Sequence, residues 1–74
     1  MSYIKPTHPT TKWSVDCFVD DQGSYGHLNA SGGVTGGIEE DRKWFASVLE
    51  AAQAASYLVQ EGWKGVRVVS DACY

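Results

Sequence analysis

The sequence contains few of the residues on which disulfide-bonded or metal-based scaffolds depend. Only two cysteines, Cys17 and Cys73, occur in 74 residues, so a disulfide-rich scaffold is excluded. These cysteines, together with His8 and His27, are the only soft metal ligands, and their spacing matches no zinc motif. We therefore expect a buried thiol at Cys17, a surface thiol at Cys73, two solvent-exposed imidazoles, and no metal or other cofactor. A disulfide between the cysteines would require adjacent strands and an oxidising compartment.

Positive charge and long apolar runs are also scarce. Six Lys and Arg residues stand against nine Asp and Glu, and the net charge of −3 argues against direct binding of nucleic acid or of an anionic membrane surface. No apolar run in the sequence approaches the roughly 18 residues of a membrane-spanning helix. Residues 1–11 lack the apolar core of a signal peptide. We expect a cytoplasmic protein.

The composition is that of one small globular domain. Hydrophobic residues make up 43% of the chain and charged residues 20%, which excludes a disordered or low-complexity sequence. Three Trp and four Tyr let a few positions bury much of the apolar surface. Residues 1–11, which include Pro6 and Pro9, predict a flexible N-terminal arm, and residues 12–74 predict a single α+β domain.

Two strands are expected in the first half of that domain. Apolar and polar residues alternate over residues 12–20, which predicts a half-buried strand with Asp16 on its polar side. Residues 20–23 have the composition of a hairpin turn, and residues 24–30 predict the second strand. The four glycines among residues 31–37 match no phosphate-binding motif, so this segment is expected to be a connector or a short edge strand.

The longest periodic segment, residues 39–61, contains no Gly or Pro and predicts a helix. Acidic residues at its start complement the helix dipole, and Gly62 fits the left-handed position after its end. Residues 64–71 predict the last strand. The predicted architecture is ββαβ, with a small three-stranded antiparallel or mixed sheet and one helix on one face. The apolar stripe of the predicted helix consists of Trp44, Phe45, Val48, Ala51, Ala52, Ala55, Leu58 and Val59.

No set of side chains forms a recognisable catalytic motif. Nucleophilic catalysis needs a nucleophile, a base and an orienting carboxylate brought together, and a fold with a single core layer has few concave pockets. The adjacent carboxylates of residues 20–21 and 39–41 are explained by their places in the predicted turn and at the predicted helix start. We therefore expect that the protein is not an enzyme.

Exposed side chains are better candidates for function. Phe18, Tyr25 and Tyr57 have no place in the predicted sheet–helix interface, and aromatic anchors dominate the energy of protein–protein binding. Acidic residues gather at the predicted hairpin and helix start, where they would meet a basic surface of a nucleic-acid-handling protein. The predicted partner-binding residues are Asp20, Asp21, Tyr25, Glu39, Glu40, Asp41 and Tyr57.

Other interpretations remain open. A sheet that carries Lys12, Trp63, Lys64 and Arg67 would bind single-stranded nucleic acid, with bases stacked on the rings. In another interpretation, the exposed aromatic rings only cover the open face of the sheet and bind no partner. An exposed sheet face or edge on so thin a core is compatible with a homodimer.

Residues 21–40 resemble the opening of HicB-type antitoxins. The similarity rests on DQGSY at residues 21–25, on Leu28, and on GVTGG at residues 33–37 followed by Glu40. In that family a hairpin of this kind leads through a Gly-x-x-Thr-x-Gly segment to an acidic, alanine-rich helix. The resemblance implies a domain that neutralises a toxin.

The whole chain, as a short acidic ββαβ unit without a catalytic motif, resembles small phage-encoded inhibitors of the anti-CRISPR type. Proteins of this type dock on the nucleic-acid-binding surface of a bacterial effector, often with acidic side chains in the place of phosphates. The resemblance implies stoichiometric inhibition of a protein partner. If a phage encodes the chain, this partner lies in the cytoplasm of the host cell.

Overall fold

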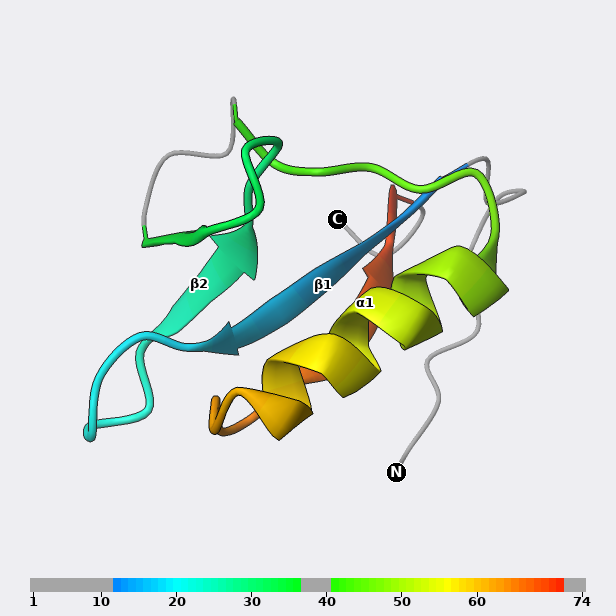
Figure 1. Ribbon diagram of the computed structural model, residues 1–74. Coiled ribbons are helices and arrows are strands. Elements are labelled where there is room, and N and C mark those ends of the chain that lie inside the picture. The colour runs from blue at the N-terminus through cyan, green and yellow to red at the C-terminus, as the bar shows by residue number, and fades with distance from the viewer. Residues whose placement is uncertain (1–11, 37–40, 72–74) are drawn as a thin grey trace.

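The computed structural model describes residues 12–36 and 41–71. This part of the chain forms a four-stranded antiparallel sheet with one helix across one of its faces (Figure 1). The elements are β1 (Trp13–Phe18), β2 (Tyr25–Leu28), β3 (Val34–Gly36), α1 (Val48–Gln60) and β4 (Arg67–Ser70). The predicted α+β class with one helix on one face is confirmed, and the sheet has one strand more than predicted. The predicted N-terminal arm, residues 1–11, lies outside the described residues.

The strand order in the sheet is β3-β2-β1-β4. β1 pairs with β2 on one side, with Asp16 opposite His27, and with β4 on the other, with Val15 opposite Val68. All three pairings are antiparallel. The additional strand, β3, comes from the glycine-rich segment and forms an edge of the sheet, which was one of the two structures expected for that segment.

Side-chain oxygens organise both hairpin turns. The carboxylate of Asp20 accepts hydrogen bonds from the backbone N–H of Gln22 and of Ser24, at 2.9 and 3.1 Å, and so confirms the predicted turn between β1 and β2. The side-chain oxygen of Asn29 accepts from the N–H groups of Ser31 and Gly33, each at 3.0 Å. The first part of the glycine-rich segment, residues 31–33, is therefore a turn held by one asparagine, and β3 follows it.

The helix is shorter than predicted: α1 begins at Val48 rather than at Glu39. Ser47 is its N-cap, and the Ser47 side chain accepts a hydrogen bond from the backbone N–H of Glu50 at 3.2 Å. A serine followed three residues later by glutamate is a signal for a helix start. The prediction that Trp44 and Phe45 belong to the helix is wrong.

Residues 41–45, which we call the strap, are extended and pair with the sheet. The strap forms isolated bridges to Asn29 and to Trp13, at the end of the sheet where β2 stops and β1 starts. The N–H of Lys43 donates to the carbonyl of Leu28 at 2.8 Å, and Phe45 exchanges two backbone hydrogen bonds with Trp13. These bonds satisfy backbone groups of the sheet that a helix at this place would leave unpaired. Figure 1 shows the strap leading along that end of the sheet to α1.

The end of α1 follows the prediction. Gly62 has a φ of 98°, and its N–H donates to the carbonyl of Val59 at 3.0 Å. The N–H of Trp63 donates to the carbonyl of Leu58 at 3.1 Å. This pair of hydrogen bonds is the Schellman arrangement, which needs a residue that tolerates positive φ.

The core lies between α1 and the adjacent face of the sheet. Its fully or nearly fully buried members are Val15, Cys17, Leu28, Ala51 and Leu58. The small side chain of Ala51 lets the helix approach the sheet closely. Cys17 is a free, buried thiol, as predicted, and burial raises its pKa, with a smaller contribution from the charge of Asp16. Cys73 lies outside the described residues.

Candidate functional site

The residues predicted to bind a partner lie at separate places in the structure. Asp20 and Asp21 are exposed in the β1–β2 turn, and Tyr25 is half-exposed at the start of β2. Asp41 belongs to the strap, and Tyr57 is exposed on α1. Glu39 and Glu40 lie outside the described residues. Because α1 begins at Val48, the acidic residue Asp41 is not at a helix start, and its neighbours are those of the strap.

Asp20 combines exposure with a structural role. Hydrogen bonds from the backbone and the side chain of Ser24, and then from the backbone of Gln22, lower the pKa of its carboxyl group below the usual value. The carboxylate therefore stabilises the turn in its ionised form. Because the side chain is exposed, its charge also faces solvent at the tip of the hairpin.

Asp41 is joined to a buried histidine. Nε2 of His27 lies 2.5 Å from Oδ1 of Asp41; the His27 side chain is 2% exposed and that of Asp41 is 46% exposed. The hydrogen bond from His27 is the main reason that the pKa of Asp41 is lowered. The prediction of a solvent-exposed imidazole at His27 is wrong, because the strap brings Asp41 to its ring nitrogen.

A buried ion pair attaches the strap to the polar face of β1. Nη1 of Arg42 donates to Oδ1 of Asp16 at 2.6 Å and to Oγ of Ser14 at 3.3 Å. Oγ of Ser14 donates in turn to the carbonyl of Lys43 at 2.8 Å. Asp16 and Arg42 are both buried, so the prediction that Asp16 lies on a solvent-facing side is wrong. Its partner comes from a segment that pattern analysis assigns to the helix.

Cations and aromatic rings extend from this ion pair in both directions. The guanidinium of Arg67 lies 3.5 Å from Oδ2 of Asp16 and 4.0 Å from the ring centroid of Tyr25. In the other direction, the guanidinium of Arg42 and Nζ of Lys12 lie 5.7 and 4.7 Å from the ring of Trp44. We call this set the cation–aromatic row. Its members are Tyr25, Arg67, Asp16, Arg42, Trp44 and Lys12.

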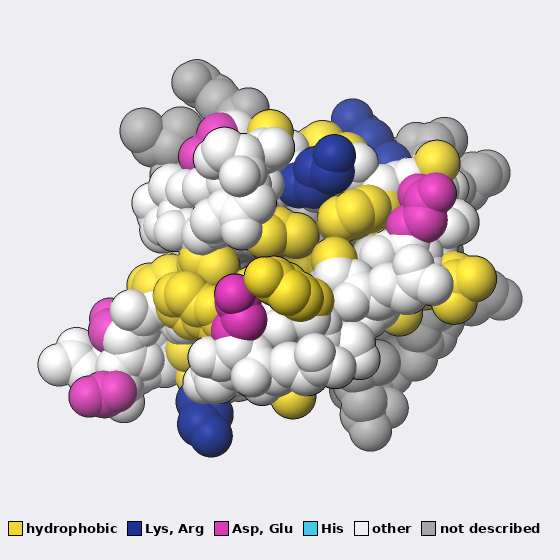
Figure 2. All heavy atoms as spheres, viewed as in Figure 1, with side chains coloured by type: hydrophobic (Ala, Val, Ile, Leu, Met, Phe, Trp, Pro, Cys, Tyr) yellow, Lys and Arg dark blue, Asp and Glu magenta, His cyan; other side chains and the backbone are white. Residues whose placement is uncertain are grey.

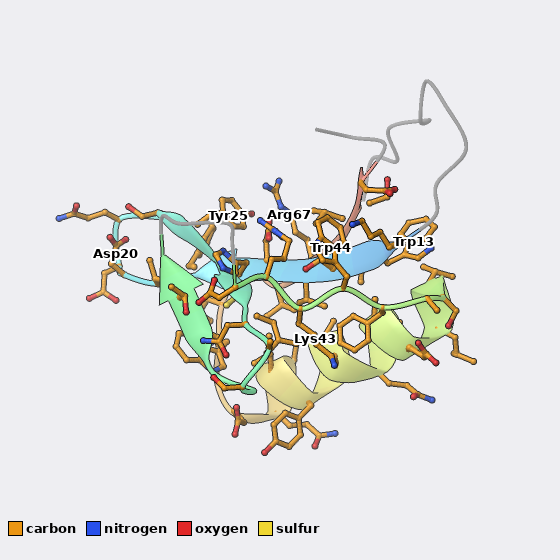
Figure 3. The ribbon with its side chains drawn as sticks, turned by 90° about the horizontal axis from the view of Figure 1, so that it is seen from above. Trp13, Asp20, Tyr25, Lys43, Trp44 and Arg67 are labelled. Atoms are coloured by element: carbon orange, nitrogen blue, oxygen red, sulfur yellow. The ribbon has the colours of Figure 1, made fainter. Side chains whose placement is uncertain are left out.

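The row lies on the face of the sheet opposite α1. Figure 3 shows the labelled side chains of Tyr25, Arg67 and Trp44 on that side, whereas Lys43 points toward the helix. Lys43 lies over the ring of Phe45, which packs against the core. Arg42 and Trp44 of the strap therefore lie on the face opposite α1, whereas Lys43 and Phe45 lie on the helix side.

The exposed surface of α1 has a different composition. Four of the six large hydrophobic side chains that are exposed among the described residues belong to this helix: Val48, Leu49, Tyr57 and Val59. The charged residues beside them are Glu50 in the first turn and Glu61 at the C-cap, and α1 contains no Lys or Arg. Glu61 raises the pKa of Tyr57 through a hydrogen bond and through its charge. Figure 2, which views the molecule from the side of α1, shows apolar and acidic side chains together there.

In residues 12–36 and 41–71, no group of three or more His, Cys, Asp or Glu side chains is placed to hold a metal ion. No helix of the described ranges is both long and apolar enough to cross a membrane. The chain matches no family model, and neither the curated proteins nor the solved structures compared with it include a significant match.

Proposed function

We propose that this protein is a non-enzymatic binding protein that inhibits a nucleic-acid-handling protein by covering its basic surface. The observation that carries this proposal is the exposed surface of α1. A helix on a globular domain usually presents charged and polar side chains to water. Here Leu49 is 66% exposed and Tyr57 is 59% exposed, and several exposed apolar side chains on one short helix favour an interaction surface.

The charges around these apolar side chains favour a basic partner. Glu50 and Glu61 lie at the two ends of α1. The hairpin that carries Asp20 and Asp21 lies at the same end of the molecule as Glu61, because the N–H of Phe18 donates to the carbonyl of Lys64 at 2.8 Å. Lys64 at this end and Lys43 on the helix side are exposed cations, and the four carboxylates of Asp20, Asp21, Glu50 and Glu61 outnumber them. A partner with apolar side chains among Lys and Arg would complement this surface.

A surface of this kind is found on proteins that bind nucleic acid, where Lys and Arg supply most of the affinity for the phosphates. Carboxylates in the positions of the phosphates would block such a surface without any catalytic reaction. This is the mode of action that the resemblance to anti-CRISPR-type inhibitors implies. In this proposal Tyr57 and Leu49 are the anchors, and the acidic residues set orientation and association rate.

The test is affinity capture from a lysate of the host cell with matched baits. The wild-type chain, a Leu49→Ala/Tyr57→Ala variant and a Tyr25→Ala variant are immobilised at equal density, and retained proteins are identified by mass spectrometry. Tyr25 is a suitable control because it is an exposed aromatic residue on the opposite face of the sheet. We expect a protein that the wild-type and Tyr25→Ala baits retain and the double variant loses.

The retained protein should also lose its nucleic-acid binding when the wild-type chain is added in equimolar amount. Glu50→Lys/Glu61→Lys should weaken its capture, whereas Lys64→Gln should not. If no protein is lost selectively with the double variant of α1, or if the captured protein still binds nucleic acid when saturated, the proposal is refuted.

A further inference from the structure

The cation–aromatic row has no part in binding through α1, because it lies on the other face of the sheet (Figure 3). The row ends in two ring–cation pairs, Tyr25 with Arg67 and Trp44 with Lys12. Between them lies the buried ion pair of Asp16 and Arg42, which contacts both pairs. The two pairs are therefore held in fixed positions by buried charge.

The Tyr25–Arg67 pair forms a flat, charged and accessible surface. Tyr25 is 42% exposed and the Arg67 side chain 48% exposed, although the guanidinium lies over the Tyr25 ring. The ring of Phe18 packs edge-on against Tyr25, with centroids 4.8 Å apart, and so limits its movement. A ring ordered before binding loses little side-chain entropy when a second flat group stacks on it.

The charge of the row is positive although the chain as a whole is acidic. It contains three cations and one carboxylate, and the same face also carries the carboxylate of Asp41 at His27, so the positive excess of the face is smaller than that of the row alone. The carboxylate, Asp16, is buried and already bonded to both arginines. Asp71 follows β4 and donates its N–H to the carbonyl of Lys12 at 3.2 Å, so one more acidic residue is found near the Trp44–Lys12 pair. The Tyr25–Arg67 pair is therefore the stronger site for an anion.

We infer that this face binds a single strand of nucleic acid, with one base stacked at each ring–cation pair and a phosphate beside Arg67 and beside Lys12. A single strand presents flat bases and phosphates together, whereas a duplex hides the faces of its bases. Rings and arginine planes provide stacking without hydrogen bonds to base edges, so little sequence preference is expected. This inference is independent of the proposed role of α1.

The test is a salt titration of oligonucleotide binding by fluorescence anisotropy. The probe is a labelled oligothymidylate of about ten nucleotides, which is within the length that one small domain covers. Two phosphate contacts predict that the logarithm of the binding constant falls with the logarithm of the salt concentration with a slope of about −1.4. Arg67→Gln and Lys12→Gln should each reduce the slope to about −0.7. Tyr25→Leu should weaken binding by about tenfold at every salt concentration.

Lys43→Gln is the matched control, because it removes the same charge from the face that α1 covers, and it should leave the slope unchanged. Circular dichroism is recorded for each variant, since Arg67 also contacts Asp16. Lys12 is exposed, so Lys12→Gln tests the inference even if Arg67→Gln unfolds.

Three results would overturn the inference. The first is the absence of binding to the oligonucleotide at low salt. The second is equal binding of a polyglutamate peptide of the same charge, which would assign the face to acidic proteins. The third is an equal loss of binding in Lys43→Gln and Lys12→Gln, which would place the strand elsewhere.

Discussion

The two faces of the sheet are covered in different ways. On one face α1 places Ala51 and Leu58 against β1, and the buried side chains that the structure describes there are apolar or a thiol, except Ser70 on β4. On the other face the strap covers Asp16 and His27 with an ion pair and a hydrogen bond. The first arrangement depends on buried area and shape, whereas the second depends on particular partners, because a buried charge without its partner is costly.

This difference has a consequence for how the two faces tolerate change. An apolar core accepts substitutions that keep its volume approximately constant. The Asp16–Arg42 pair accepts the removal of both charges more readily than the removal of one. The face covered by the strap should therefore tolerate fewer single substitutions than the face covered by α1. Substitutions on each face test this difference.

The largest effect is expected for Arg42→Ala, which removes the closer of the two cations that contact buried Asp16 and leaves it with the half-exposed Arg67. The free energy of unfolding should fall by about 3–5 kcal/mol, measured by urea denaturation. Leu58→Ala on the helix side should cost about 2–5 kcal/mol through the cavity that it leaves.

A second substitution at Asp16 then tests whether the loss of stability in Arg42→Ala comes from an uncompensated buried charge. Asp16→Leu/Arg42→Met should recover most of the stability lost in Arg42→Ala, because no buried charge remains uncompensated and the half-exposed Arg67 is solvated by water. A loss of less than about 1 kcal/mol in Arg42→Ala would be typical of an exposed ion pair and would contradict the burial of Asp16.

A smaller effect is expected at Ser47, where the strap ends and α1 begins. Ser47→Ala removes the acceptor for the N–H of Glu50 and should lower the free energy of unfolding by about 1 kcal/mol. Ser56→Ala, on the exposed part of α1, is the control, since it should be neutral or slightly stabilising through helix propensity. Thermal unfolding followed by circular dichroism compares the two, and equal values would place the start of the helix elsewhere.

The smallest effect is expected from the titration of the strap in acid. The pKa of Asp41 is lowered in the folded protein, so its ionised form stabilises the fold. This contribution is complete above the unfolded pKa of about 3.9 and is lost as the pH falls through the lower folded pKa. Asp41→Asn should therefore flatten the acid limb of a plot of unfolding free energy against pH.

The pKa of Asp20 is also lowered, by hydrogen bonds within the hairpin turn, so Asp20→Asn should flatten the same limb separately. Because the main hydrogen-bond partners of Asp20 and Asp41 are different, the two effects should be additive in the double variant. An Asp41→Asn curve that runs parallel to that of the wild type below about pH 4 would show that the contact with His27 does not stabilise the fold.

Local signals in the sequence were sufficient to predict much of the fold. The turn at residues 20–23 and the left-handed Gly62 depend on residues close in the chain, and both were predicted correctly. The start of α1 was missed because Trp44 and Phe45 continue the helical spacing of apolar residues. The Ser47 and Glu50 pair was the signal that could have placed it.

The covering of the polar face could not be predicted in the same way. Asp16 and Arg42 are 26 residues apart, and His27 and Asp41 are 14 apart, so no local pattern connects them. Among the predicted site residues, Tyr25 and Tyr57 are both exposed, but they lie on opposite sides of the sheet. Pattern analysis identifies candidates for exposure and charge, whereas only the fold shows which of them share a surface.

The pairing of β1 with β4 also constrains how the protein is made. Trp13 lies opposite Ser70, so the interior strand gains its second neighbour only when nearly all of the described chain has left the ribosome. Until then one edge of β1 presents unpaired backbone N–H and C=O groups, and edges of this kind favour pairing with other chains. Contacts between residues so distant along the chain also slow folding, so completion of the sheet is expected to follow synthesis rather than accompany it.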